Sequence, residues 1–133
     1  ELVSRILSAL NDNLQEIILI NDSSQDNTWN VIQEIAKAHH GVKGINLMKN
    51  FGQHSAILCG LNYVSGEVVI TMDDDLQNPP EEITKMVDLL ESDKNIDAVI
   101  GVPEIVIVFA DHAAVTPAGR FDPALIPVAP VVV

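Results

Sequence analysis

Short apolar runs alternate with amphipathic helical patterns along residues 1–101, and this alternation is the feature that most restricts the fold. Four runs are expected to be buried strands, because they are short, apolar and bounded by polar residues: 16–20, 44–48, 67–72 and 97–101. Helical spacing of apolar residues occurs between them, in residues 2–10, 29–36, 54–64 and the segment after Pro80. Strands that alternate with helices form mostly parallel sheets with helices on both faces. The sequence therefore predicts an α/β fold.

The third predicted strand runs directly into three consecutive aspartates, Asp73, Asp74 and Asp75. Adjacent carboxylates repel one another, and a hard divalent cation with oxygen ligands relieves that repulsion. If the backbone stays extended, Asp73, Asp75 and Gln77 share one face and Asp74 points to the other. This pattern favours a Mg²⁺ or Mn²⁺ site that holds diphosphate oxygens. An acidic turn that only solvates the strand end is the alternative.

Composition indicates one compact domain without an electrostatic surface for nucleic acids. The chain has 133 residues, of which 47% are hydrophobic, enough for a single core. Its net charge of −12 excludes a basic nucleic-acid footprint, so binding of a polyanion would require a cation. No apolar run approaches the ~20 residues that span a bilayer. The chain itself is therefore expected to be soluble.

The pattern changes after Gly101. Residues 102–133 contain five of the seven prolines, which exclude a long helix and suit extended or edge packing. Residues 105–109 are apolar enough to add a strand. We expect residues 1–101 to form the main unit, and residues 102–133 to be a Pro- and Val-rich tail that packs on the sheet or extends it.

Three polar segments follow the ends of predicted strands: residues 21–28 (NDSSQDNT), 49–56 (KNFGQHSA) and 73–83 (DDDLQNPPEEI). They resemble motifs of family-2 glycosyltransferases, which have the GT-A nucleotide-sugar fold. Their order and spacing match the family, and the resemblance covers about residues 1–101. The amino-acid sequences of these motifs are most similar to those of the polyprenyl-phosphate glycosyltransferases. This group includes dolichol-phosphate mannosyltransferases and enzymes that load undecaprenyl phosphate with 4-deoxy-4-formamidoarabinose.

The resemblance implies metal-dependent transfer of a sugar from a nucleotide-diphosphate sugar to a polyprenyl phosphate at the cytoplasmic face of a membrane. It assigns nucleotide-sugar binding to Asp22, Ser24, Lys49, Asp73 and Asp74, and it assigns Mg²⁺ or Mn²⁺ binding to Asp73, Asp75 and Gln77. No catalytic residue is assigned, because the acceptor phosphate is already ionised at neutral pH and needs no strong general base. A helix-entry cap at Asp22 and an ordinary surface lysine at Lys49 are the simpler interpretations.

The chain also departs from the family pattern. Asn21 stands where the family usually has Asp. Family members begin with a strand before the first helix and continue beyond the equivalent of Gly101 into acceptor-binding elements. A membrane contact is therefore expected only through parts that this chain lacks. The alternative function is a fragment that binds donor and metal but is catalytically incomplete.

Two other classes of protein fit the sequence less well. A response-regulator receiver domain has a phosphorylated aspartate after one of its later strands and requires a lysine beyond that aspartate. No lysine follows Lys94 in this chain. A dinucleotide-binding Rossmann domain requires Gly-x-Gly-x-x-Gly after a strand, and the sequence does not contain it.

Overall fold

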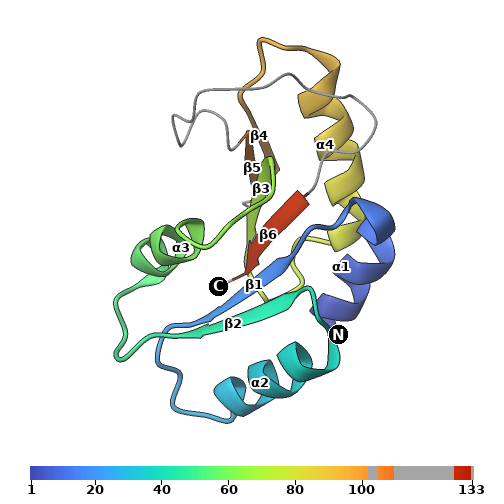
Figure 1. Ribbon diagram of the computed structural model, residues 1–133. Helices are drawn as coiled ribbons and strands as arrows, with labels where there is room; N and C mark the ends of the chain where they lie inside the picture. The colour runs from blue at the N-terminus through green and yellow to red at the C-terminus, as the bar shows by residue number, and fades with distance from the viewer. Residues whose placement is uncertain (102–104, 110–127, 133) are drawn as a thin grey trace.

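The computed structural model describes residues 1–101 and two further strands, at 105–109 and 128–132. Its centre is a six-stranded sheet with the order β2-β1-β6-β3-β5-β4 (Figure 1). The strands are β1 (Ile17–Asn21), β2 (Val42–Asn46), β3 (Val68–Met72), β4 (Ala98–Gly101), β5 (Ile105–Phe109) and β6 (Val128–Val132). The helices are α1 (Leu2–Leu10), α2 (Thr28–Ala38), α3 (Gln53–Leu61) and α4 (Ile83–Ser92), with 3₁₀ turns η1 (Asn11–Asn13) and η2 (Pro80–Glu82). The predicted α/β fold is confirmed.

Helices cover both faces of the sheet, as predicted. β1 is buried along its whole length, so its alternating side chains enter two separate cores. Ile17 and Leu19 join a core with buried side chains of α1, α2 and α4, whereas Ile18 and Ile20 join a smaller core with Ala56 of α3. Figure 1 shows α3 across the sheet from α1 and α4.

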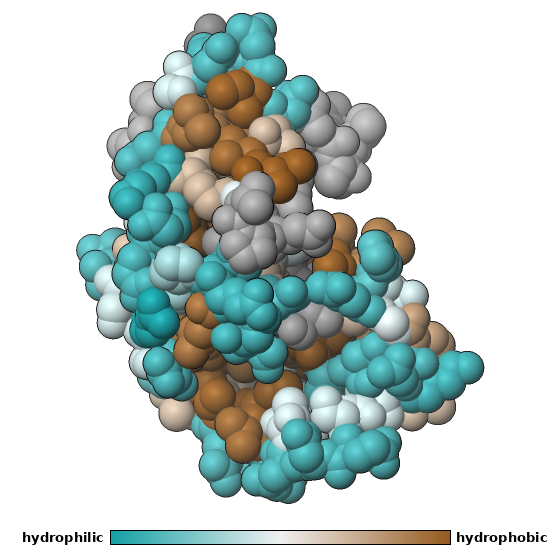
Figure 2. Space-filling view, turned by 180° about the vertical axis from the view of Figure 1, so that it is seen from behind, coloured by the Kyte–Doolittle hydropathy of each residue, from teal (hydrophilic) through white to brown (hydrophobic). Residues whose placement is uncertain are grey.

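The smaller core leaves part of α3 uncovered. Of its residues only Ala56 and Gly60 are buried, while Leu58 and Leu61 are exposed. Seen from behind, the molecule has apolar patches between hydrophilic regions (Figure 2). The large apolar side chains that are exposed among the described residues are Val31, Met48, Phe51, Leu58, Leu61, Tyr63, Leu89 and Ile100.

The sheet differs from the prediction in the bounds of one strand and in the direction of another. The second predicted strand lies two residues earlier, because β2 pairs with β1 in a register that places Val42 opposite Ile17. β4 was expected to continue the parallel sheet, but its neighbour is β5, which runs antiparallel to both β3 and β4. The other neighbouring pairs, β1 with β2, β1 with β6 and β3 with β6, are parallel. The sheet is therefore mostly parallel, with an antiparallel strand near one edge.

β6 lies inside the sheet. The sequence, in contrast, favoured extended or edge packing for the proline-rich segment. The strand is extended, but it runs between β1 and β3 and parallel to both. Pro130 lies opposite Ile70 in this register. A proline has no N–H for the ladder and is normally confined to edge strands. Its central position is decided by long-range packing, which residue type alone does not reveal.

Glu16 is buried immediately before β1, at the amino end of the parallel strands. Its carboxylate accepts hydrogen bonds from the Lys43 ammonium, and from the backbone N–H (2.6 Å) and hydroxyl (2.7 Å) of Ser65. Burial raises the pKa of Glu16, but the hydrogen bonds from Lys43 and Ser65 outweigh it and leave the pKa below its usual value. The carboxylate thus joins β1, β2 and the segment before β3.

Candidate functional site

Three polar loops meet at the carboxyl end of the parallel strands, opposite Glu16. They follow β1, β2 and β3, and they contain the three motifs found in the sequence. In open α/β sheets, ligands bind in the crevice outside the carboxyl ends of the strands. The topology therefore gathers segments that are distant in the sequence at the edge where binding is expected.

Asp22 connects the loop after β1 to the start of α3. Its Oδ1 accepts the backbone N–H of Phe51 and its Oδ2 accepts that of Gly52, both at 2.8 Å. Gly52 precedes the first residue of α3 and has φ 86° and ψ 155°, a region that is essentially restricted to glycine. Asp22 therefore fixes the backbone just before α3, whereas neither α3 nor α2, the helix that follows Asp22 in the sequence, has a side-chain cap.

Gln53 connects α3 to the acidic loop. Its side-chain Nε2 donates to Oδ1 of Asp73 at 2.7 Å. Because Gln53 directly follows Gly52, the two sets of hydrogen bonds form a continuous link from Asp22 to Asp73. The three sequence motifs are thus joined physically, and Gln53 is a site residue that sequence reasoning missed. Its only signal was its place inside the second motif.

Asn21 and Asn46 join the ends of β1 and β2. Nδ2 of Asn21 donates to Oδ1 of Asn46 at 2.7 Å, and Oδ1 of Asn21 accepts the backbone N–H of Ser24 at 3.2 Å. Asn21 is buried, whereas Ser24 is exposed. Asn21, at which the chain departs from the family pattern, therefore shapes the loop that carries Asp22 and Ser24.

The acidic loop is bent, so the expected alternation of its side chains is wrong. β3 ends at Met72, and residues 74–78 form successive bends in which the backbone N–H of Gln77 donates to Oδ1 of Asp75 at 2.9 Å. Leu76 has φ 61° in this loop, and Ser23 has φ 62° in the loop after β1. Positive φ in residues other than glycine costs free energy and is concentrated at functional sites. Two of the three loops that meet at this edge thus carry backbone strain.

The acidic loop supplies hard oxygen donors for a cation. Asp74, Asp75 and Gln77 are exposed, and Asp73 is half-buried. Among the described residues, no three His, Cys, Asp or Glu side chains are close enough to share a metal ion. The donor chemistry fits Mg²⁺ or Mn²⁺, and the assignment of Asp73, Asp75 and Gln77 as ligands stays a prediction.

Lys49 supplies positive charge to the loop after β2. Its Nζ lies 5.0 Å from the centre of the Phe51 ring, a cation–π distance. The side chain is exposed, and the loop is tied to Asp22 through the N–H of Phe51. Lys49 is thus near the same edge as the carboxylates, where its role in binding stays a prediction.

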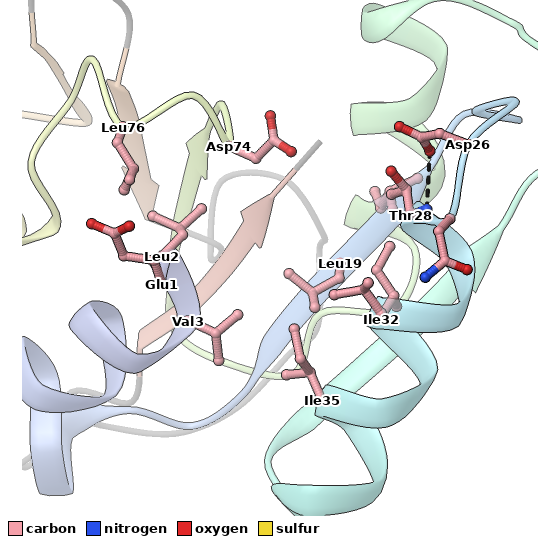
Figure 3. A pocket seen from close by; sticks show the side chains of 13 residues that line it. Glu1, Leu2, Val3, Leu19, Asp26, Thr28, Ile32, Ile35, Asp74 and Leu76 are labelled. Atoms are coloured by element: carbon pink, nitrogen blue, oxygen red, sulfur yellow. Dashed lines mark hydrogen bonds between the residues drawn. The ribbon is translucent and has the colours of Figure 1, made fainter.

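A pocket of about 550 Å³ lies beside the acidic loop, between α1, α2 and β1. Figure 3 shows the aliphatic side chains of Leu2, Val3, Leu19 and Ile32 projecting into it. Its full lining is Glu1, Leu2, Val3, Leu19, Ile20, Asp26, Asn27, Thr28, Val31, Ile32, Ile35, Asp74 and Leu76. No sequence pattern predicts this pocket, because the apolar residues of α1 and α2 have the ordinary spacing of core positions.

Asp26 lies at the polar end of this pocket, which Asp74 also lines. Oδ1 of Asp26 accepts the backbone N–H of Thr28 at 2.9 Å, at the first turn of α2. Hydrogen bonds from the Thr28 hydroxyl and its backbone N–H lower the pKa of Asp26. The pocket therefore combines an aliphatic floor with carboxylates from two of the three motifs.

Comparison with known proteins agrees with this arrangement. The family model described as glycosyl transferase family 2 matches residues 1–114. The chain belongs to this family. Its membership confirms the resemblance drawn from the three motifs and agrees with the α/β fold.

A relative in Shewanella sediminis (strain HAW-EB3) is named undecaprenyl-phosphate 4-deoxy-4-formamido-L-arabinose transferase. It is 47% identical to this family-2 chain over 90 residues, which are 65% of this chain and 27% of the relative. The chain thus matches about a quarter of that protein's length. In the part of the chain that the structure describes, no helix has the length and apolarity to cross a membrane.

Proposed function

We propose that this chain carries the donor site of a glycosyltransferase that moves a sugar from a nucleotide-diphosphate sugar to a polyprenyl phosphate, with Mg²⁺ or Mn²⁺. Family membership supports glycosyl transfer, and the name of the Shewanella relative supports undecaprenyl phosphate as the acceptor. The reaction would then occur at the cytoplasmic face of a membrane.

The observation that carries the proposal is the hydrogen-bonded link across the sheet edge. Asp22 holds the backbone of Phe51 and Gly52, and Gln53 holds Asp73. This link brings polar groups from all three motifs to one end of the sheet, and in open α/β sheets ligands bind at that end. It therefore supports a nucleotide site there. A merely solvated acidic turn would not need a bond to the start of another helix.

The proposed roles follow from position and charge. Asp22 and Ser24 lie after β1 and contact the nucleoside part of the donor, and Asp74 lies beside the pocket and contacts the nucleotide sugar. Lys49 offsets diphosphate charge. The proposed metal ligands are Asp73, Asp75 and Gln77, and a bound divalent ion there would stabilise negative charge on the departing diphosphate.

The chemical step is substitution at the anomeric carbon. An ionised oxygen of the acceptor phosphate forms the new bond, the bond from the anomeric carbon to the donor diphosphate breaks, and nucleoside diphosphate leaves with the electron pair. The nucleophile is already deprotonated, so the step requires no proton transfer to this chain. The task of its residues is to bind and orient the donor.

Binding of donor nucleotide tests the site assignment. Asp75→Asn is expected to lower Mn²⁺-dependent affinity for UDP or GDP by more than about tenfold, since an anionic metal ligand is lost. Asp73→Asn should act in the same way, and Asp74→Asn should act less. Isothermal titration calorimetry with Mn²⁺ and with chelator measures it, and Asp88→Asn on α4 is the matched control. Equal affinities for Asp75→Asn and Asp88→Asn would refute the metal assignment.

Turnover separates the enzyme from the alternative of a donor-binding but catalytically incomplete domain. The chain is incubated with radiolabelled UDP- or GDP-sugars, Mn²⁺ and undecaprenyl phosphate in detergent, and label in the lipid extract is counted. All proposed residues lie on the donor side, at positions 22–77, so we expect binding to exceed transfer in this chain. Orientation of the two substrates accounts for about 7–11 kcal/mol of rate acceleration. Rapid transfer would show that residues after Gly101 include a working acceptor site.

A further inference from the structure

β6 is the only strand that joins the two parts of the described sheet. β1 and β2 form one part, β3, β5 and β4 form the other, and β1 and β3 meet only through β6. The space between β1 and β3 is therefore a slot one strand wide. We call this space the β6 slot, defined by Ile17–Asn21 on one side and Val68–Met72 on the other.

The β6 slot is already lined with buried side chains that belong to helix-covered cores. Ile18, Val68 and Ile70 are fully buried, and Val69 is nearly so. These strands pack against α1, α2 and α4 on one face and α3 on the other. What the slot needs is an extended apolar segment with free backbone groups on both sides, because unpaired backbone groups at such a position are costly.

The strand that fills the slot is held unequally. β6 pairs with β3 over five residues, from Val128 to Val132, but with β1 only through Val131 and Val132. Pro130 contributes no N–H to the ladder. A central strand with short pairing on one side and a missing donor is a candidate for exchange.

Sequence distance permits the exchange. Residues 110–127 join β5 to β6, and 18 residues reach at most about 60 Å when extended. A second copy of the chain presents an identical slot, so its β6 would make the same backbone pairs and differ only in the connection. Exchange of an identical element between copies is a low-cost route to dimers.

We infer that the β6 slot is a strand-binding site that accepts residues 128–132 of a second copy of this chain, running parallel to β1 and β3. The two copies then exchange their β6 strands, and the sheet of each is completed by its partner. This inference is independent of the proposed glycosyl transfer, because it rests on strand order, register, the missing N–H of Pro130 and the length of the connection.

Disulfide trapping tests the exchange directly. Thr71 lies opposite Val131 in the register of β3 and β6, and neighbouring strands hold such residues at about 4.7–4.9 Å, within the Cα range of a disulfide. In a Cys59→Ser background, a chain with Thr71→Cys is mixed with a chain with Val131→Cys under mild oxidation. Thr71 is only half-buried, so cysteine is a mild substitution there.

The expected result is a disulfide-linked pair that increases with protein concentration and exceeds, by several-fold, the pair formed by Thr71→Cys with Ser92→Cys. Ser92 is exposed at the end of α4 and reports random collision. Non-reducing gels and mass spectrometry identify the linked peptides. A yield equal to that of the control at every concentration would overturn the exchange.

The double variant, Thr71→Cys with Val131→Cys in one chain, checks the register. It is expected to close an internal disulfide at low concentration and to link copies at high concentration. Failure to form either bond would overturn the placement of β6 and the inference with it. Val69→Cys and Ala129→Cys, which lie opposite each other two residues earlier, provide a second pair if the first disturbs folding.

Discussion

The two ends of the parallel strands hold carboxylates in opposite ways. At the amino end, Glu16 is buried and accepts three hydrogen bonds from Lys43 and Ser65. At the carboxyl end, Asp74 and Asp75 are exposed in a bent loop. A buried carboxylate with its donors in place stabilises the fold, whereas an exposed acidic loop keeps oxygens available for a ligand. The acid that is best satisfied is therefore structural, and the less satisfied ones stay the predicted ligand-binding residues.

Glu16→Ala is expected to have the largest effect on stability and would show whether the amino end is the structural one. The free energy of unfolding should fall by about 3 kcal/mol, because the Ser65 N–H and hydroxyl each lose a hydrogen bond to a charged group, about 1.5 kcal/mol apiece, while the exposed Lys43 ammonium regains water. Urea denaturation measures it. Glu67→Ala is the control, since Glu67 is exposed just before β3. Equal losses in the two variants would remove the distinction between the ends.

Gly52→Ala is expected to cost about 2 kcal/mol, because its φ of 86° and ψ of 155° are strained for any residue with a Cβ. The added methyl meets no atom within 4 Å, so the cost is one of backbone conformation. Gly41→Ala is the matched control, since its Cβ would lie 3.9 Å from the Gln15 carbonyl oxygen, an ordinary contact. Equal melting temperatures for the two variants would show that the backbone at Gly52 is not strained.

Asp22→Asn is expected to lower stability by about 1 kcal/mol, because an amide offers one oxygen to the N–H groups of Phe51 and Gly52 where the carboxylate offers two. Donor affinity should fall with it, since the same bonds hold the entry of α3. Asp75→Asn should instead lower affinity with little loss of stability. Combined denaturation and calorimetry test this contrast, and a stable Asp22→Asn variant with full affinity would refute the link.

The smallest effect is expected in acid. Hydrogen bonds from Arg5 lower the pKa of Glu81 from 4.5 to about 2, and Glu81 lies in η2, which follows the acidic loop. The folded pKa is below the unfolded one, so this contribution is complete above pH 4.5 and is lost as the pH falls from about 4.5 through about 2. Because the pair is exposed, the effect is small.

Melting temperatures between pH 6 and pH 2 measure this contribution. Glu81→Gln should be less stable than the parent at pH 6, and the difference should shrink as the pH falls towards 2. Glu91→Gln, an exposed acid on α4, is the control. A constant difference between the parent and Glu81→Gln across this range would show that the Arg5 pair is not the cause.

The position of Asp22 and Asp73 at one end of the sheet was predictable. Both follow apolar runs that were expected to be strands, and parallel strands bring their carboxyl ends together. The conformation of the acidic loop was not predictable, because the positive φ of Leu76 ends the alternation that an extended chain would have. Gln53 was missed because its partner, Asp73, is twenty residues away.

The sequence by itself determined the α/β class, the approximate positions of strands and helices in residues 1–101, and the family. These depend on local periodicity and residue type, which each segment carries within itself. Only the tertiary structure decided where β5 and β6 enter the sheet, how Asp22 and Gln53 join the three motifs, and that Glu16 is satisfied by Ser65, 49 residues away. Such contacts form between segments that are distant in the chain, so packing of the whole molecule selects them and no local pattern records them.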